Sequence, residues 1–123
     1  QVGSDCKDRE AFKEIDYRQM FGGQAKWVAE VTDTARIPEY VARAYTTALQ
    51  GRPGPVVLVF PEEVLSNRAD VADARPVQVA QSAPRPSDMA QLREMLAEAK
   101  RPLLILGGGG WTAQANADLR RFA

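Results

Sequence analysis

Histidine is absent from this chain of 123 residues, and cysteine occurs only once, as Cys6. Without histidine the chain lacks the side chain that most often serves as a general base and as a metal ligand. A single cysteine cannot form an internal disulfide, which fits a reducing compartment, and it has no histidine to pair with as a nucleophile. The composition therefore argues against a self-contained hydrolase and against a zinc site.

Net charge and long apolar segments are lacking as well. The 16 basic residues balance 16 acidic ones, and no block of like charge indicates binding to nucleic acid. The longest uninterrupted apolar run, Val56–Phe60, is far too short to span a bilayer. No basic stretch followed by an apolar one marks a targeting signal at the N-terminus. We therefore expect a cytoplasmic protein with neither a nucleic-acid nor a membrane partner.

A β-α-β pattern occupies residues 25–60. Residues 25–31 alternate roughly between apolar and polar side chains, which predicts a strand. A core-facing helix is predicted from the apolar stripe Ile37, Tyr40, Val41, Ala44, Tyr45, Ala48 and Leu49, with Pro38 in its first turn. Gly51 stands where a left-handed residue ends a helix, and the prolines after it hold the chain extended. The apolar run Val56–Phe60 then predicts a strand buried on both faces, as in parallel sheets covered by helices.

The flanking segments give weaker signals. Asp8 is expected to cap a short helix, and residues 17–23 are expected to be irregular. Residues 67–87 have the composition of a linker, after which Ser87 or Asp88 can cap a helix. That helix carries Met89, Leu92, Met95, Leu96 and Ala99 along one face.

A second apolar strand is predicted at Leu103–Leu106, with a further helix from about Thr112. The order of elements predicts an α/β fold, with parallel sheets covered by helices in parts of two α/β domains joined by a linker.

Two short motifs can carry chemistry, and each has a plainer alternative. Gly107–Gly110 follows a predicted strand and precedes a helix, where backbone N–H groups can approach a phosphate, although a tight turn explains the glycines equally well. Glu62 and Glu63 could act as paired carboxylates, or could simply begin a helical turn whose dipole favours acids. The chemistry of the residues alone leaves both questions open.

Several longer segments together resemble the acetolactate synthase-like family. The segments are AFKEIDYRQMFGGQAKWVAEV, IPEYVARAY, GRPGPVVLVFPEE and AKRPLLILGGG, in this order and spacing. The resemblance implies a thiamine diphosphate-dependent enzyme that acts on 2-oxo acids, with Mg²⁺ holding the diphosphate, FAD in some members, and a dimer or tetramer as the whole molecule. It also implies that residues 1–66 end a pyrimidine-binding domain, that 67–87 are the linker, and that 88–123 begin a central, nucleotide-binding-like domain.

The same resemblance assigns expected roles to particular residues. Phe12 matches the phenylalanine of the family's AFQE loop at the active-site entrance, where Lys13 replaces the usual glutamine. Glu62 stands where biosynthetic members usually carry lysine, which reverses a charge and puts the branched-chain biosynthetic role in doubt. Arg52 matches a flavin contact, and Gly107, Gly108 and Gly109 match a nucleotide-binding turn. We hypothesise that Lys13 and Glu62 are a paired change.

The family's activating glutamate and its Gly-Asp-Gly…Asn segment for metal and diphosphate find no match in these residues. The chain begins at Gln1 and ends in a predicted helix, so we expect a piece of a longer enzyme that is inactive by itself, with no catalytic residue and no metal ligand of its own. The alternative is a non-catalytic nucleotide-binding or assembly module built on the same scaffold.

Overall fold

The computed structural model describes all residues 1–123, which fall into two compact units, Gln1–Gln81 and Ser82–Ala123. In the first unit the elements are η1 (Ser4–Cys6), α1 (Tyr17–Phe21), β1 (Trp27–Glu30), η2 (Thr34–Arg36), α2 (Ile37–Leu49), β2 (Val56–Val59) and α3 (Glu62–Ser66). The second unit contains α4 (Pro86–Glu98) and α5 (Ala113–Phe122). None of these helices has the length and apolar character that crossing a membrane requires.

The centre of the first unit is a two-stranded parallel sheet. β1 pairs with β2 in a register that places Trp27 beside Val56 and Glu30 beside Val59. A parallel pair needs a crossover connection, and α2 supplies it. The α/β class with parallel strands, predicted from the sequence, is therefore confirmed.

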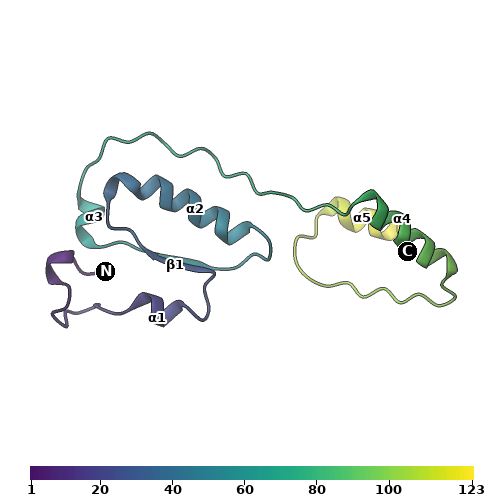
Figure 1. Cartoon of the computed structure of the whole chain (residues 1–123), viewed down its shortest axis with the longest axis horizontal. Helices are drawn as coiled ribbons and strands as arrows, with labels where there is room; N and C mark the ends of the chain where they lie inside the picture. Colours follow the sequence, from purple (N-terminus) through teal and green to yellow (C-terminus); the bar gives the residue numbers. More distant parts are fainter. The chain divides into compact units, whose positions relative to one another are not determined.

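Two layers lie against opposite faces of this sheet, with α2 on one side and α1 on the other (Figure 1). Successive side chains of β1 point to opposite faces of the sheet, so this one strand contacts both layers. The Trp27 ring stacks on Tyr40 of α2, with ring centroids 5.9 Å apart. Val28 and Glu30 point to the opposite face, where Tyr17 and Arg18 of α1 lie around the same cavity.

The buried core of this unit is small. Its apolar members are Ala29, Val31, Val59 and Val64, of which Val31 is 0% exposed. In β2 only Val59 is buried, so the prediction of a strand buried on both faces is wrong. Phe60, which was predicted in the strand, lies just beyond its end. In a sheet of only two strands both strands are edge strands, so the side chains of β2 are only partly covered.

The α2 helix has the predicted bounds, with Pro38 in its first turn and Gly51 at φ +62° just after its end. Tyr45 and Leu49, however, are exposed, although the apolar stripe predicted them at the core. Two strands are too narrow to cover the whole stripe.

Three local predictions near the N-terminus and at α4 are wrong. Asp8 caps no helix and instead adopts a left-handed φ of 62°. Residues 17–21 form α1, because the Asp16 carboxylate accepts hydrogen bonds from the N–H groups of Arg18 and Gln19. The α4 helix begins at Pro86 after Arg85, so neither Ser87 nor Asp88 is its cap.

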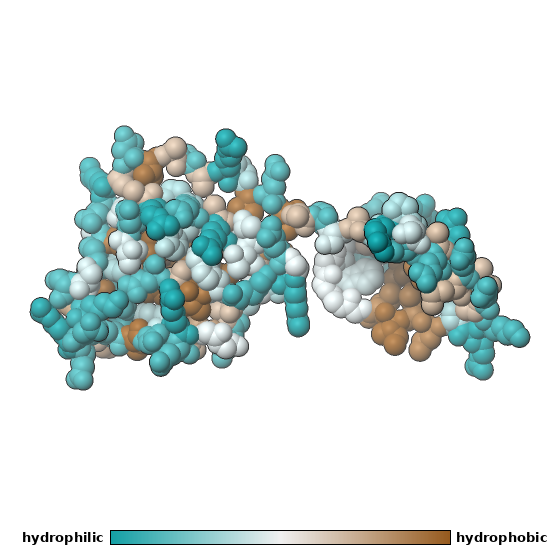
Figure 2. Space-filling view, viewed as in Figure 1, coloured by the Kyte–Doolittle hydropathy of each residue, from teal (hydrophilic) through white to brown (hydrophobic).

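The predicted strand at Leu103–Leu106 does not form. The segment has no ladder partner, and Leu103 and Ile105 are each 84% exposed. A strand needs neighbouring backbone for its N–H and C=O groups, and the second unit contains no other strand to supply it. Apolar, brown surface in this unit is visible in Figure 2.

The helix expected from Thr112 is present as α5, and the Thr112 hydroxyl accepts a hydrogen bond from the N–H of Ala115 at 3.0 Å. The acids Glu62 and Glu63 occupy the first turn of α3, the position that the plainer interpretation of that pair predicts.

Candidate functional site

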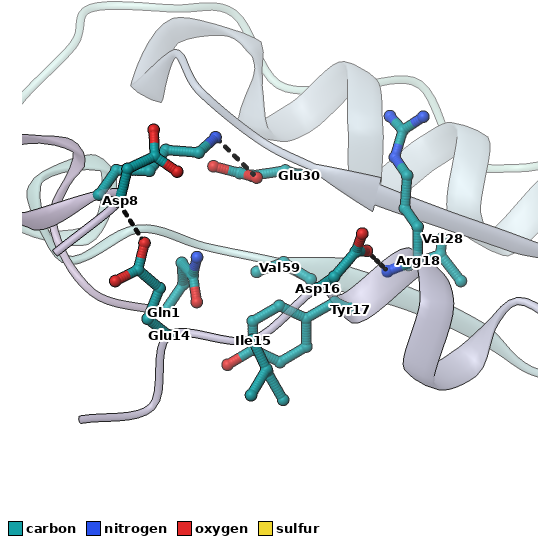
Figure 3. Close-up of a pocket in the computed structure, with 11 residues that line it drawn as sticks. Gln1, Asp8, Glu14, Ile15, Asp16, Tyr17, Arg18, Val28, Glu30 and Val59 are labelled. Carbon is teal, nitrogen blue, oxygen red and sulfur yellow. Dashed lines mark hydrogen bonds and ion pairs between the residues drawn. The ribbon is translucent and has the colours of Figure 1, made fainter. Parts of the chain in front are cut away.

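A polar cavity of about 350 Å³ lies in the first unit, where both parallel strands end (Figure 3). Glu30 and Val59, the last residues of β1 and β2, form part of its wall. The remainder comes from Val28 of β1, from Gln1, from the segment 7–16 and from α1. Ligands of parallel α/β sheets bind at the carboxyl ends of strands, so this edge is the candidate site.

Charged groups around the cavity are mostly satisfied within the chain. The Lys7 ammonium lies 3.9 Å from the Glu30 carboxylate, and the Asp16 carboxylate caps α1. One acceptor is left over, because the side-chain oxygen of Gln1 is buried without a hydrogen-bond partner.

Glu14 organises the loop that precedes α1. Its carboxylate accepts hydrogen bonds from the N–H groups of Ala11 at 3.0 Å, Arg9 at 3.3 Å and Asp8. These bonds to Ala11 and Asp8 lower the pKa of Glu14, because they stabilise the charged form. Glu14 was not predicted as a site residue, and its only signal in the sequence is that it matches the glutamate of the AFQE motif.

Phe12 and Lys13 lie on this loop, side by side. The Phe12 ring is 85% exposed, and the Lys13 ammonium lies 5.5 Å from the ring centroid. Lys13 has a left-handed φ of 72°, and its carbonyl accepts a hydrogen bond from the Tyr17 hydroxyl at 3.3 Å. The structure thus presents an aromatic ring and a cation together at the surface.

Glu62 is exposed in α3, and neither a hydrogen bond nor an ion pair joins it to Lys13. Its neighbour Glu63 has a structural role, since its carboxylate accepts a hydrogen bond from the N–H of Ser4 at 3.1 Å. The Ser4 side chain, more than this backbone N–H, lowers the pKa of Glu63 because it stabilises the charged carboxylate. Glu63 therefore ties the N-terminal segment to the turn that follows β2.

Arg52 lies on the exposed turn between α2 and β2. The turn is held by Lys26, whose ammonium donates to the carbonyls of Gln50 at 2.7 Å and Arg52 at 3.0 Å. A Cβ on Gly54 would lie 3.0 Å from the Lys26 side chain, which would have to shift to accept a larger residue there. Arg52 thus has a braced backbone and an exposed side chain.

Gly107, Gly108 and Gly109 belong to the second unit, apart from the unit that contains Arg52. No atom of the chain lies within 4 Å of a Cβ built on any of them. Gly108 has φ +77°, which favours glycine, whereas packing within the chain requires none of the three.

The side chains of this chain do not form a site for a metal ion. No group of three His, Cys, Asp or Glu side chains is arranged to hold a metal ion. Three of the acids near the cavity are occupied, since Glu14 and Asp16 accept backbone N–H groups and Glu30 pairs with Lys7. We therefore derive no reaction step through a metal-bound cofactor from these residues.

The fold and the cavity define a parallel α/β unit of the class that binds small ligands at the carboxyl ends of its strands. The acetolactate synthase large subunit of Corynebacterium glutamicum is 35% identical to the chain over 131 residues, which cover 100% of the chain and 20% of that protein. Escherichia coli K12 acetolactate synthase isozyme 2 large subunit is 32% identical over 99% of the chain and 22% of its own length. No family model matches the chain.

Glyoxylate carboligase of Escherichia coli O157:H7 is also similar, with 31% identity over 94% of the chain and 20% of that protein. Along its whole length the chain resembles the acetolactate synthase-like family, and it spans about a fifth of the length of the curated relatives it matches.

Proposed function

We propose that this chain is a segment of a thiamine diphosphate-dependent enzyme that decarboxylates a 2-oxo acid and transfers or protonates the resulting carbanion. The observation that carries the proposal is similarity along the whole chain to both acetolactate synthases and a glyoxylate carboligase. When bound, thiamine diphosphate supplies the carbanion chemistry, and the protein supplies binding and electrostatics.

The proposed division of labour follows the family resemblance. Residues 1–66 would end the pyrimidine-binding domain, 67–87 would link it to the central domain, and 88–123 would begin that domain. Phe12, Lys13 and Glu62 would lie at the entrance to the active site. The exposure of Phe12 and Glu62 supports this placement, because nothing within the chain covers either side chain.

The proposal also includes nucleotide binding. Arg52 with Gly107, Gly108 and Gly109 would contact FAD in a parent enzyme that retains it. The open space around these glycines is compatible with a close approach by phosphate. A yellow chromophore released from the purified gene product would identify flavin, and a colourless protein would exclude this role.

The parent enzyme would be a magnesium-dependent, cytoplasmic dimer or tetramer, while these 123 residues alone would be catalytically silent. Silence is expected because neither the family's activating glutamate nor its Gly-Asp-Gly…Asn segment has a match in these residues. The alternative remains a non-catalytic nucleotide-binding or assembly module on the same scaffold.

The coding sequence on either side of the chain distinguishes the two functions. The enzyme requires an activating glutamate upstream of Gln1 and a Gly-Asp-Gly…Asn segment downstream of Ala123. Finding both supports the enzyme, whereas an open reading frame with neither leaves the binding or assembly module.

A further inference from the structure

The loop over residues 8–13 has a backbone conformation that costs free energy. Asp8, Glu10 and Lys13 all have left-handed φ angles, of 62°, 55° and 72°. Residues with a Cβ rarely adopt this region, and several such residues in one short loop persist only where surrounding groups hold them.

The Glu14 carboxylate is the group that holds this loop. It binds the N–H groups of Asp8, Arg9 and Ala11, while its own N–H donates to the carbonyl of Ala11 at 2.9 Å. The loop receives one further hydrogen bond, which the Tyr17 hydroxyl donates to the carbonyl of Lys13. One side chain therefore stabilises most of the loop.

The result of this arrangement is an exposed pair, the Phe12 ring and the Lys13 ammonium. No acid forms an ion pair with Lys13, and no packing explains an aromatic ring that is 85% exposed. An apolar surface beside a free cation suits a small anion with an apolar end, since the ammonium can bind a carboxylate and the ring can cover an alkyl group.

We propose that Glu14 is a positioning residue, whose carboxylate holds residues 8–13 so that Phe12 and Lys13 together recognise the carboxylate end of a small 2-oxo acid. The choice of ligand rests on the proposed function, whereas the holding of the loop by Glu14 does not. Glu14 also lines the cavity at the ends of the strands, whose other charged residues are Lys7, Asp8, Asp16, Arg18 and Glu30, whereas Phe12 and Lys13 do not line it.

Amide hydrogen exchange on the whole chain tests the first part. Glu14→Gln places an NH₂ donor against backbone donors, so exchange at Asp8, Arg9 and Ala11 should rise at least about threefold. Glu10→Gln removes the same charge from an exposed side chain in the same loop and should leave these amides unchanged. Unchanged exchange in Glu14→Gln would overturn the proposal.

A second measurement needs no variant and serves if Glu14→Gln unfolds the chain. The amide proton shifts of Asp8 and Ala11 in the unmodified chain should titrate together with the Glu14 carboxyl carbon, at a pKa below the ordinary glutamate value. Titration of these amides with a different group would overturn the holding role.

The ligand is tested in the complete gene product with pyruvate as the probe. Lys13→Gln and Glu14→Gln should each raise KM at least about fivefold while kcat changes less than about twofold, because they weaken binding rather than chemistry. Glu10→Gln should change neither, and an unaltered KM in the two variants would overturn the recognition role. Absence of all thiamine-dependent turnover would refute the proposed function instead, and the amide measurements would still decide the role of Glu14.

Discussion

At the scale of single residues, the side chains that organise this protein are those that bind the backbone of a distant turn. Lys26 braces the turn after α2, and Glu63 binds the N-terminal segment. Both are polar residues whose partners lie more than 20 positions away in sequence. Each joins two segments that a sheet of only two strands could not hold by apolar packing.

Replacing Lys26 by methionine should destabilise the first unit. The change removes two hydrogen bonds to carbonyls near the C-terminal end of α2 and a favourable interaction with its dipole, together worth about 1 kcal/mol. Urea unfolding followed by tryptophan fluorescence would measure the loss. Lys13→Met is the matched control, because the Lys13 ammonium is exposed and has no hydrogen bond or ion pair, and equal losses in the two variants would contradict the bracing role.

Stability should fall in acid for a defined reason. Backbone N–H groups lower the pKa of Glu14, and Ser4 lowers that of Glu63, so the folded chain binds these protons less readily than the unfolded chain does. Their contribution is present above the ordinary glutamate pKa of 4.5 and is lost as pH falls through the lower folded values. The free energy of unfolding measured from pH 6 to about pH 3 should decline, and less steeply in Glu14→Gln. A slope that this variant leaves unchanged would count against the assignment to Glu14.

The roles of Glu14 and Lys26 could not be predicted from the sequence, because each depends on which backbone groups come within reach after folding. Phe12 and Lys13 were found only through the family resemblance, since an exposed Phe-Lys pair has no pattern of its own. Their place at an active-site entrance stays a prediction.

At the scale of elements, the best predictions were those where local signals agreed with each other. The α2 helix combines an apolar stripe with Pro38 at its start and Gly51 after its end, and its bounds were correct. The α1 helix was missed because five residues capped by Asp16 carry too little periodicity to detect.

Gly51→Ala should destabilise the first unit by about 1 kcal/mol, because a Cβ is unfavourable at φ +62°. No atom lies near the added methyl group, so the loss would come from the backbone alone. Gly23→Ala is the matched control, since Gly23 has equal space and no positive φ. Thermal unfolding followed by circular dichroism would compare the two, and an equally stable Gly51→Ala variant would contradict a left-handed turn.

The missing strand at Leu103–Leu106 shows the limit of element prediction. The composition correctly indicates an apolar segment. A strand, however, forms only when its backbone can hydrogen-bond to a neighbouring strand, and the second unit contains no such partner. The same reasoning explains why Tyr45 and Leu49 of α2 are exposed, although their spacing predicts a core position.

At the scale of the whole molecule, the exposed segment Leu103–Leu106 should make the isolated chain associate with itself. Four consecutive apolar residues with unpaired backbone are a template for pairing with another copy. Ile105→Lys should lower the average mass measured by light scattering at a given concentration. Val71→Lys changes an exposed apolar residue in the linker and should have little effect. A monomeric unmodified chain would contradict this expectation.

The most direct test of the central claim is thiamine diphosphate-dependent release of CO₂ from 2-oxo acids by the protein made from the complete coding sequence. We expect release that requires both thiamine diphosphate and Mg²⁺, and none from residues 1–123 alone. A folded complete protein that neither binds thiamine diphosphate nor releases CO₂, or turnover by residues 1–123 without the rest of the chain, would contradict the claim.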